Sequence, residues 1–166
     1  MCGRTLNRTL WLLIFWCTFQ ATAGEPGEWL FDSLADVPGA AKSEGQRVYE
    51  VLLKMLDRWN AHDVEAYLDA YWKSPQLLVV LDSAQFDGWQ QLHDYYLNGY
   101  PDRNSMGYIS PARIQIKLLK PDLALAWWSI SFPNSRSKVV GNSTINLQKF
   151  DHGWKIVAAH SSTTDL

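Results

Sequence analysis

Hydrophobic residues follow a helical period in the first half of the chain. From Glu44 onward, apolar residues recur at spacings of three and four, which is typical of an amphipathic helix. The stripe consists of Val48, Val51, Leu52, Met55, Leu56 and Trp59. A second, shorter helix is expected after Asp63, because aspartate often caps helix N-termini. It ends by Ser74, because the residue before a proline avoids helical backbone angles.

The pattern changes to the period of a strand in the second half. A short apolar run at residues 77–82 predicts a buried strand, and a third helix is expected from Trp89 to about Asn98. After Gly107, apolar and polar residues alternate in four long segments, at residues 108–119, 123–132, 138–150 and 154–163. The turns between them are short, so successive strands are expected to pair antiparallel. Helices followed by strands predict an α+β fold, with the helices on one face of a curved sheet.

The N-terminal residues have the features of a signal peptide. Arg4 and Arg8 precede the apolar stretch LWLLIFWCTF, and small residues follow where signal peptidase cleaves. The stretch is too short to span a membrane, so an N-terminal anchor is the weaker alternative, and no later apolar run is long enough for a span. We therefore expect a secreted or periplasmic protein with a signal peptide at residues 1–23, a leader segment at 24–43 and one domain at 44–166.

Removal of the signal peptide changes both the cysteine count and the charge. Cys2 and Cys17 are the 2 cysteines of the chain, so the mature domain would hold no disulfide, catalytic thiol or cysteine-ligated metal. Loss of Arg4 and Arg8 from the 15 basic residues leaves 13 of them against 17 acidic residues. This balance argues against a nucleic-acid partner, which needs a basic surface. The 4 histidines lack the spacing of metal ligands, so neither a metal nor a cofactor is expected.

Several motifs resemble the nuclear transport factor 2-like superfamily and, more narrowly, its SnoaL-like group. They are RWNAHDVEAYLDAYW, FDGWQQLHDYY, GYP leading into Met106-Gly107, LALAWW, GNSTINLQKFDHGWKIV and the closing HSS, within residues 46–163. The resemblance implies a cone-shaped domain in which three N-terminal helices pack on a strongly curved, mainly antiparallel sheet and enclose a pocket. It also implies a homodimer that pairs through the sheet. The fold hosts isomerases, dehydratases, cyclases and binding domains, so it does not define a function.

His160 is the first candidate for chemistry. Strict alternation along the last strand places Trp154, Ile156, Ala158, His160 and Ser162 on one face. In the fold that the resemblance implies, this face lines the cavity, with His160 near its mouth. Imidazole exchanges protons near neutral pH, which suits a general acid or base. The alternative is a structural histidine that ties down the last strand through a hydroxyl or carbonyl group.

Aromatic and acidic residues complete the candidate site. A small apolar or ring-containing ligand would suit a wall of aromatic rings with phenol groups, formed by Trp59, Tyr67, Tyr71, Tyr96 and Trp128. The alternative is that these residues simply pack in the core. Ser162 is a further candidate ligand contact. Asp82 ends a buried run and is either a desolvated base that works with His160 or a turn residue.

Two functions remain open at this point. The first is an exported domain that binds a small molecule, with isomerase, dehydratase or cyclase chemistry through His160 and Asp82 as an extension. The second is a non-catalytic, dimeric protein-interaction module. An open cavity that exposes His160 would favour the first function. Trp59, Trp128 and Trp154 closing that space would favour the second.

Overall fold

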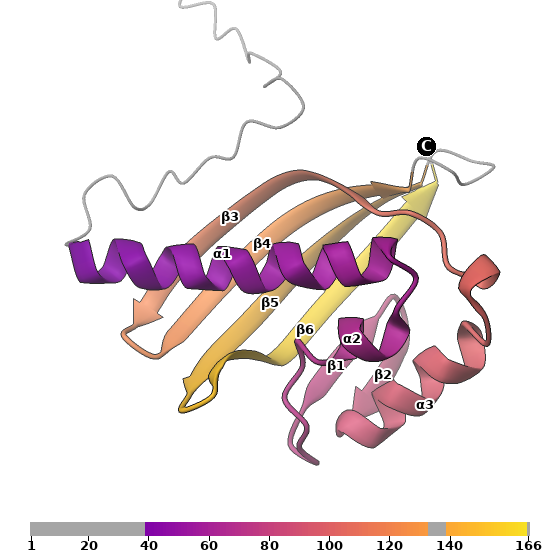
Figure 1. Cartoon of the computed structure of the whole chain (residues 1–166), viewed down its shortest axis with the longest axis horizontal. Helices are drawn as coiled ribbons and strands as arrows, with labels where there is room; N and C mark the ends of the chain where they lie inside the picture. Colours follow the sequence, from indigo (N-terminus) through magenta and orange to yellow (C-terminus); the bar gives the residue numbers. More distant parts are fainter. Residues whose placement is uncertain (1–38, 133–138, 166) are drawn as a thin grey trace, which may run out of the picture.

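The structure is a computed structural model that describes residues 39–132 and 139–165 (Figure 1). The expected signal peptide at residues 1–23 and most of the expected leader lie outside the described residues. In the described part of the chain, no helix is both long and apolar enough to cross a membrane.

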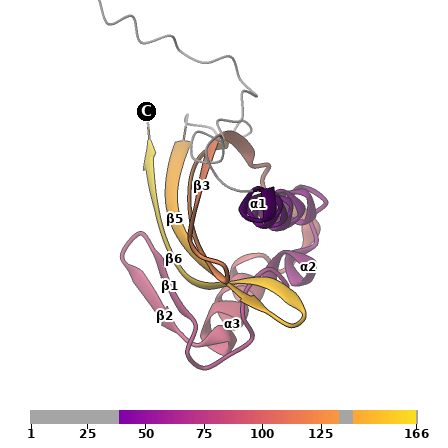
Figure 2. The ribbon, with the colours of Figure 1, turned by 90° about the vertical axis from the view of Figure 1, so that its left-hand side faces the viewer.

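The first helix, α1, runs from Gly39 to Asn60 and therefore begins five residues before the expected start at Glu44. Its apolar stripe is buried, with Val48, Leu52 and Met55 at most 2% exposed. Figure 2 shows α1 lying along the concave side of the sheet, which explains why one side of this helix is apolar.

The second helix, α2 (Val64–Leu68), begins as predicted, because the side chain of Asp63 accepts a hydrogen bond from the backbone N–H of Ala66 at 3.0 Å. It ends earlier than the sequence suggests. Beyond it, the backbone N–H of Trp72 donates to the carbonyl of Ile156, and the N–H of Ile156 donates to the carbonyl of Ala70, both at 2.9 Å. These bonds hold the chain in an extended bridge to the last strand, which a continued helix could not form.

A short hairpin follows that the sequence analysis missed. Strand β1 (Leu78–Leu81) matches the expected buried run, but β2 (Ala84–Asp87) pairs with it antiparallel before α3 (Trp89–Gly99) begins. Of the four residues in β2, Phe86 alone is buried, so the strand has no alternating apolar signal. The sequence had suggested that all helices precede the strands, but α3 follows the hairpin of β1 and β2.

The six strands form one mixed sheet in the order β2-β1-β6-β5-β4-β3. The four long strands are β3 (Ser110–Lys120), β4 (Leu123–Phe132), β5 (Val139–Phe150) and β6 (Gly153–Asp165). They pair antiparallel in sequence order, which confirms the predicted meander, whereas β1 pairs parallel with β6. Figure 2 shows that the sheet is strongly curved. The described part of the chain thus has an α+β fold.

One strand carries an extra residue that changes the alternation of its side chains. Ile156 of β6 pairs with Leu147 of β5, and Ala158 pairs with Asn146, so Val157 between them has no partner. Such a β-bulge shifts every later residue of the strand to the opposite face. Before the bulge, Trp154 and Ile156 face the core; after it, Ala159 does so and His160 is exposed.

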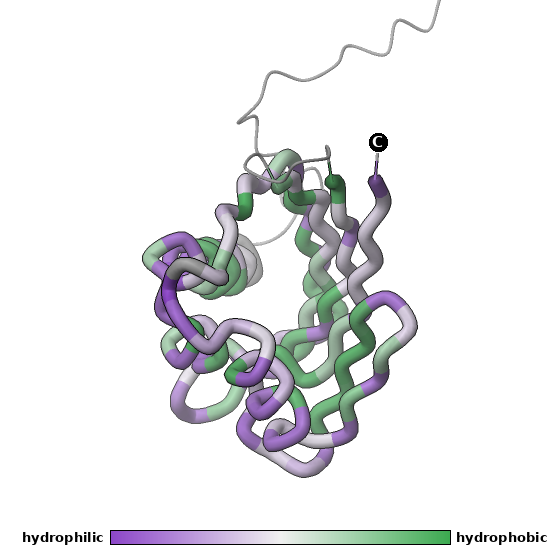
Figure 3. The backbone as a smooth tube through the Cα atoms, turned by 90° about the vertical axis from the view of Figure 1, so that its right-hand side faces the viewer, coloured by the Kyte–Doolittle hydropathy of each residue, from purple (hydrophilic) through white to green (hydrophobic). Residues whose placement is uncertain are grey.

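The core lies between the concave face of the sheet and the helices. Every second residue of β4 is buried there, namely Ala124, Ala126, Trp128 and Ile130. Figure 3 shows hydrophobic positions concentrated along the strands and on α1. Burial of this apolar surface supplies the main driving force for folding.

Glu44 connects the start of α1 to the turn between β5 and β6. Its carboxylate accepts hydrogen bonds from Lys149 Nζ at 3.0 Å and from Trp154 Nε1 at 2.9 Å, and it pairs with Arg47. The hydrogen bond from Lys149, followed by that from Trp154, lowers the pKa of the Glu44 carboxyl from its ordinary value. The folded state therefore stabilises the ionised form of Glu44 relative to its protonated form.

We expect Glu44→Gln to lower the free energy of unfolding at pH 7 by about 1 kcal/mol, because charge-assisted hydrogen bonds are replaced by neutral ones. The lowered pKa means that this contribution is complete above the ordinary pKa of 4.5 and is lost as the pH falls through the folded-state pKa. Urea unfolding at pH 7 and pH 3 measures the difference. Glu50→Gln, on the exposed side of α1, is the control, and an equal loss in both variants would contradict the role of Glu44.

Candidate functional site

A cavity of about 180 Å³ lies between the concave face of the sheet and the helices. Aromatic and aliphatic side chains dominate its lining, which includes Leu56, Trp59, Tyr67, Tyr71, Leu81, Tyr95, Tyr96, Tyr100, Ile109, Trp128, Ile130, Phe132, Ile145 and Ala159. Polar contributions come from Asp82, Ser143, Ser161, Ser162 and Thr163. The cavity therefore has an apolar interior with a few polar groups, the usual composition of a small-molecule site.

The wall on the helix side contains a cluster of three tyrosines. The hydroxyl of Tyr67 lies 3.3 Å from the hydroxyl of Tyr71 and 3.3 Å from that of Tyr96. Burial is the main cause that raises the pKa of all three phenols, and those of Tyr67 and Tyr96 rise well above the ordinary value. The hydroxyls are thus neutral at physiological pH and serve as hydrogen-bonding groups rather than bases.

Trp59 fixes this wall to the rest of the molecule. Its indole Nε1 donates a hydrogen bond of 2.7 Å to the carbonyl of Gly107. Its ring meets the ring of Tyr67 edge-on at 5.1 Å and that of Tyr100 at 4.9 Å, between centroids. Edge-to-face contacts of this kind restrict each ring to one orientation, so the wall is preformed.

The wall on the sheet side contains a row of three paired residues. Trp128 of β4 is opposite Ser143 of β5, which in turn is opposite Ser161 of β6. Ser161 Oγ donates to Ser143 Oγ at 2.8 Å, and Ser143 is only 4% exposed. Neither serine is among the residues selected from the sequence, and strict alternation along the last strand placed Ser161 on the outer face.

The structure contradicts the expected position of His160. The bulge at Val157 turns its side chain to the face of the sheet opposite the cavity, where it is exposed. The expectation that His160 shares a face with Trp154 and Ile156 is therefore wrong. Ala159 lines the cavity in its place.

Asp82 lies at the rim of the cavity rather than inside it. It follows β1 with a positive φ of 53°, and its carboxylate accepts hydrogen bonds from the backbone N–H of Thr163 at 2.7 Å and from the Thr163 hydroxyl at 3.1 Å. Its side chain is exposed, which does not fit a desolvated base. The structure does not bring Asp82 and His160 together as a catalytic pair, because Asp82 bonds to Thr163 and His160 faces away from the cavity.

The other residues predicted from the sequence lie on the cavity wall or at its rim, and their role as ligand contacts stays a prediction. Trp59, Tyr67, Tyr71, Tyr96 and Trp128 line the cavity and are at most 7% exposed, while Ser162 lies at its exposed rim. Tyr95 and Tyr100 are further lining residues that the sequence analysis did not select. Their positions, one and four residues from Tyr96, do not by themselves distinguish a pocket from a core.

Within residues 39–132 and 139–165, no group of three or more His, Cys, Asp or Glu residues is placed to hold a metal ion. Asp82 is the carboxylate that lines the cavity in this part of the chain, and the remaining titratable groups of the lining are tyrosines.

Comparison with solved structures identifies the fold. A protein of unknown function with an NTF-2-like fold from Shewanella oneidensis aligns with a TM-score of 0.66 and 27% identity, over 70% of this chain and 97% of that one. A candidate scytalone dehydratase from Novosphingobium aromaticivorans aligns with a TM-score of 0.62 and 13% identity, over 76% and 90% of the two chains. A candidate calcium/calmodulin-dependent protein kinase II association domain from Xanthomonas campestris gives 0.58 and 16%, over 76% and 89%.

No protein-family model matches the chain, and no curated protein matches it. The structural likenesses confirm the resemblance that the sequence motifs indicated: the chain has the fold of the nuclear transport factor 2-like superfamily. Its narrower similarity to the SnoaL-like group stays a prediction.

We expect Asp82→Ala to lower the free energy of unfolding by about 1 kcal/mol, because the N–H of Thr163 loses its acceptor and alanine is strained at positive φ. Asp82→Asn should cost clearly less, since asparagine tolerates this backbone conformation and offers the same acceptor, and the exposed Asp82 carboxylate, unlike that of Glu44, accepts its hydrogen bonds from the uncharged groups of Thr163. Chemical denaturation of both variants measures the effect. If asparagine destabilises as much as alanine, the charge of Asp82 matters and its hydrogen bond to Thr163 does not.

Proposed function

We propose that this domain binds a small, mostly apolar, ring-containing molecule in the cavity between its sheet and its helices. The observation that carries the proposal is the preformed aromatic wall around a space of about 180 Å³. An apolar cavity of roughly 150 Å³ is enough to bind benzene. The cavity is therefore large enough for one aromatic ring with a small substituent.

The character of the lining narrows the class of ligand. In the described residues, no lysine, arginine or histidine side chain lines the cavity, and its one carboxylate lies at the rim. Burial of a charged ligand group without an opposite charge would be costly. The proposed ligand is therefore neutral, and it is held by ring contacts and a few hydrogen bonds.

Proton transfer through His160 is not part of the proposal, because that side chain points away from the cavity. Binding without chemistry is the simplest function that this lining supports. A reaction would have to use Asp82 at the rim or the neutral tyrosine hydroxyls. A candidate scytalone dehydratase has the same fold, but this likeness concerns the fold alone and assigns no reaction to this chain.

The rival function, a protein-interaction module with a filled cone, receives less support. Trp59 and Trp128 form walls of the cavity without closing it. Trp154 is not part of the lining, and its indole N–H is bound to Glu44. The space that the interaction module would fill is thus open.

Toluene and indene are suitable first probes, because each carries one aromatic ring system and no charge. We expect both to bind the purified protein and to raise its melting temperature through preferential binding to the folded state. Ala159→Leu places a larger side chain on the cavity wall and should weaken binding at least about tenfold, as expected when a ligand's space is occupied. Ligand-observed NMR gives the dissociation constants.

Ala158→Leu is the matched control, because Ala158 is the neighbour of Ala159 on β6 and lies outside the cavity lining. It should leave binding unchanged. Equal binding by both variants would show that the probes bind elsewhere. No binding by the unsubstituted protein would contradict the proposed function.

We also propose that the protein is exported and forms a homodimer. Export is supported by the signal-peptide features at residues 1–23, and pairing through the sheet is supported by its convex face, which no described helix covers (Figure 2). Protein recovered outside the cytoplasm of its host should begin at Gly24 by mass spectrometry and show twice the monomer mass by light scattering. An intact N-terminus or a monomer mass would contradict the respective proposal.

A further inference from the structure

We propose that a second cavity binds the carboxylate group of a small organic acid, with the ammonium groups of Lys54 and Lys155 as its partners. This cavity has a volume of about 230 Å³ and lies between α1, the end of α2 and the start of β6. It shares no lining residue with the aromatic cavity between the sheet and the helices. The proposal is therefore independent of the function proposed for that first cavity.

One part of the lining of the second cavity is apolar. Its most buried members are Met55, which is 2% exposed, and Trp154, which is 4% exposed. The other apolar members are Val51, Ala66 and Ala70. Such a surface gains free energy when it covers a hydrocarbon chain or ring, whereas a fully hydrated inorganic ion gains nothing from it. The lining therefore favours a ligand with an apolar portion.

The other part of the lining is charged. Its titratable residues are Lys54, Asp69, His152 and Lys155. Lys155 Nζ donates one hydrogen bond to the backbone carbonyl of Asp69, which leaves two of the three N–H groups of the ammonium for other acceptors. Lys54 is exposed and forms no hydrogen bond or ion pair within residues 39–132 and 139–165. Both ammonium groups can thus accept a further anionic partner.

Asp69 does not balance these positive charges. Its carboxylate already forms an ion pair of 2.9 Å with Lys73, and this bond is the main cause that lowers the pKa of the Asp69 carboxyl. The charges of Lys155 and Lys54 lower that pKa as well. Three ammonium groups therefore act on a single carboxylate, and the cluster keeps an excess of positive charge.

The pKa of Lys155 reflects the same excess. Burial lowers the pKa of this half-buried ammonium from its ordinary value, and the charges of Lys73 and Lys54 lower it further, although Asp69 has the opposite effect. An ammonium group that is partly removed from water and surrounded by like charges is stabilised by an added anion. A carboxylate suits the position, because its two oxygens can accept hydrogen bonds from two ammonium groups.

Benzoate and benzamide form a matched pair of probes, because they differ in charge and are similar in size. We expect the purified protein to bind benzoate about fivefold more tightly, the scale of a partly exposed ion pair. Lys54→Gln and Lys155→Gln should each reduce this preference, because each removes one ammonium group. Chemical-shift titration of the methyl group of Met55, which lines the second cavity and not the first, gives the dissociation constants for this site.

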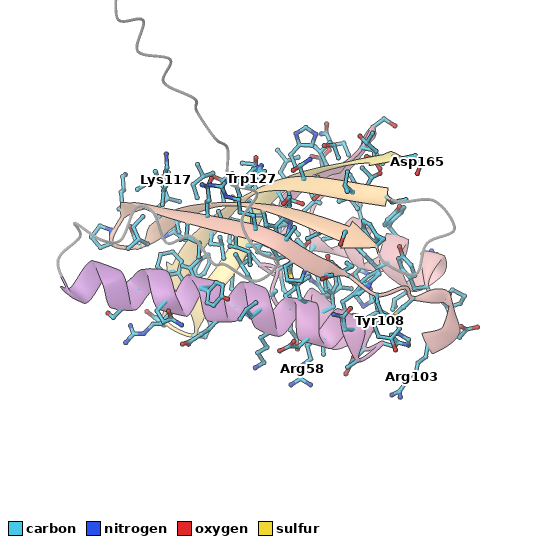
Figure 4. All side chains as sticks on the ribbon, turned by 90° about the horizontal axis from the view of Figure 1, so that it is seen from above. Arg58, Arg103, Tyr108, Lys117, Trp127 and Asp165 are labelled. Atoms are coloured by element: carbon cyan, nitrogen blue, oxygen red, sulfur yellow. The ribbon has the colours of Figure 1, made fainter. Side chains whose placement is uncertain are left out.

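Lys117→Gln is the matched control, because it removes the same charge from an exposed residue of β3. Lys117 lies on the side of the sheet away from α1, which carries Lys54 (Figure 4). This variant should leave benzoate binding unchanged, and so should Ala159→Leu, which narrows the first cavity alone. In the unsubstituted protein, benzoate should raise the pKa of Lys155, which NMR titration of its side chain measures directly.

The Lys54→Gln variant decides the outcome, since its exposed position on α1 makes a folding defect unimportant. Weaker benzoate binding in Lys54→Gln, with unchanged binding in Lys117→Gln, supports the inference. Absence of benzoate binding, equal affinity for benzoate and benzamide, or equal losses in the Lys54 and Lys117 variants overturns it. Each of these results leaves the binding of toluene in the first cavity, and with it the proposed function, unaffected.

Discussion

The unpaired residue Val157 in β6 determines which side chains reach the cavity. Because side chains alternate along a strand, one extra residue reverses the face of everything that follows it. Trp154 and Ile156 reach the core before the bulge, whereas Ala159 and Ser161 line the cavity after it. The small side chains of Ala159 and Ser161 leave space where the larger ring of His160 would otherwise lie. The bulge thus leaves space in the cavity and turns the imidazole of His160 away from it.

The rest of the cavity depends on contacts that hold the helices at a fixed distance from the sheet. Hydrogen bonds between the backbones at Ala70, Trp72 and Ile156 join the segment after α2 to β6. Glu44 joins the start of α1 to the turn end of the sheet, and the indole of Trp59 joins the end of α1 to Gly107. Of the residues that make these contacts, Trp59 alone lines the cavity, so the others position its walls from outside. A preformed space of this kind lowers the entropic cost of binding a small molecule.

Much of the fold could be predicted from the sequence, because its elements carry strong periodic signals. The stripe in α1, the cap at Asp63 and the four long strands all follow from local patterns of apolar residues. The hairpin partner β2 could not be found in this way, since Phe86 is its single buried residue. The early end of α2 is set by a bridge to β6, a contact between residues far apart in the sequence.

The candidate site was predictable only in part, for a related reason. The five aromatic residues line the cavity because they belong to apolar faces that the sequence identifies correctly. His160, Ser161 and Asp82 depend instead on the register between β6 and its neighbours. Hydrophobic periodicity reveals neither the unpaired residue Val157 nor the hydrogen bonds from Thr163 to Asp82. Residue types can suggest a catalytic pair, but strand register decides whether its members meet.

Thiol labelling tests the bulge and its consequence most directly. Cysteine would be introduced by Ala159→Cys or His160→Cys in a chain whose own Cys2 and Cys17 are changed to serine, and its rate of reaction with a maleimide would be measured. The account predicts fast labelling at position 160 and slow labelling at position 159, where toluene should slow the reaction further. Fast labelling at 159 with protection at 160 would show that the alternation continues without a bulge, and would contradict the account.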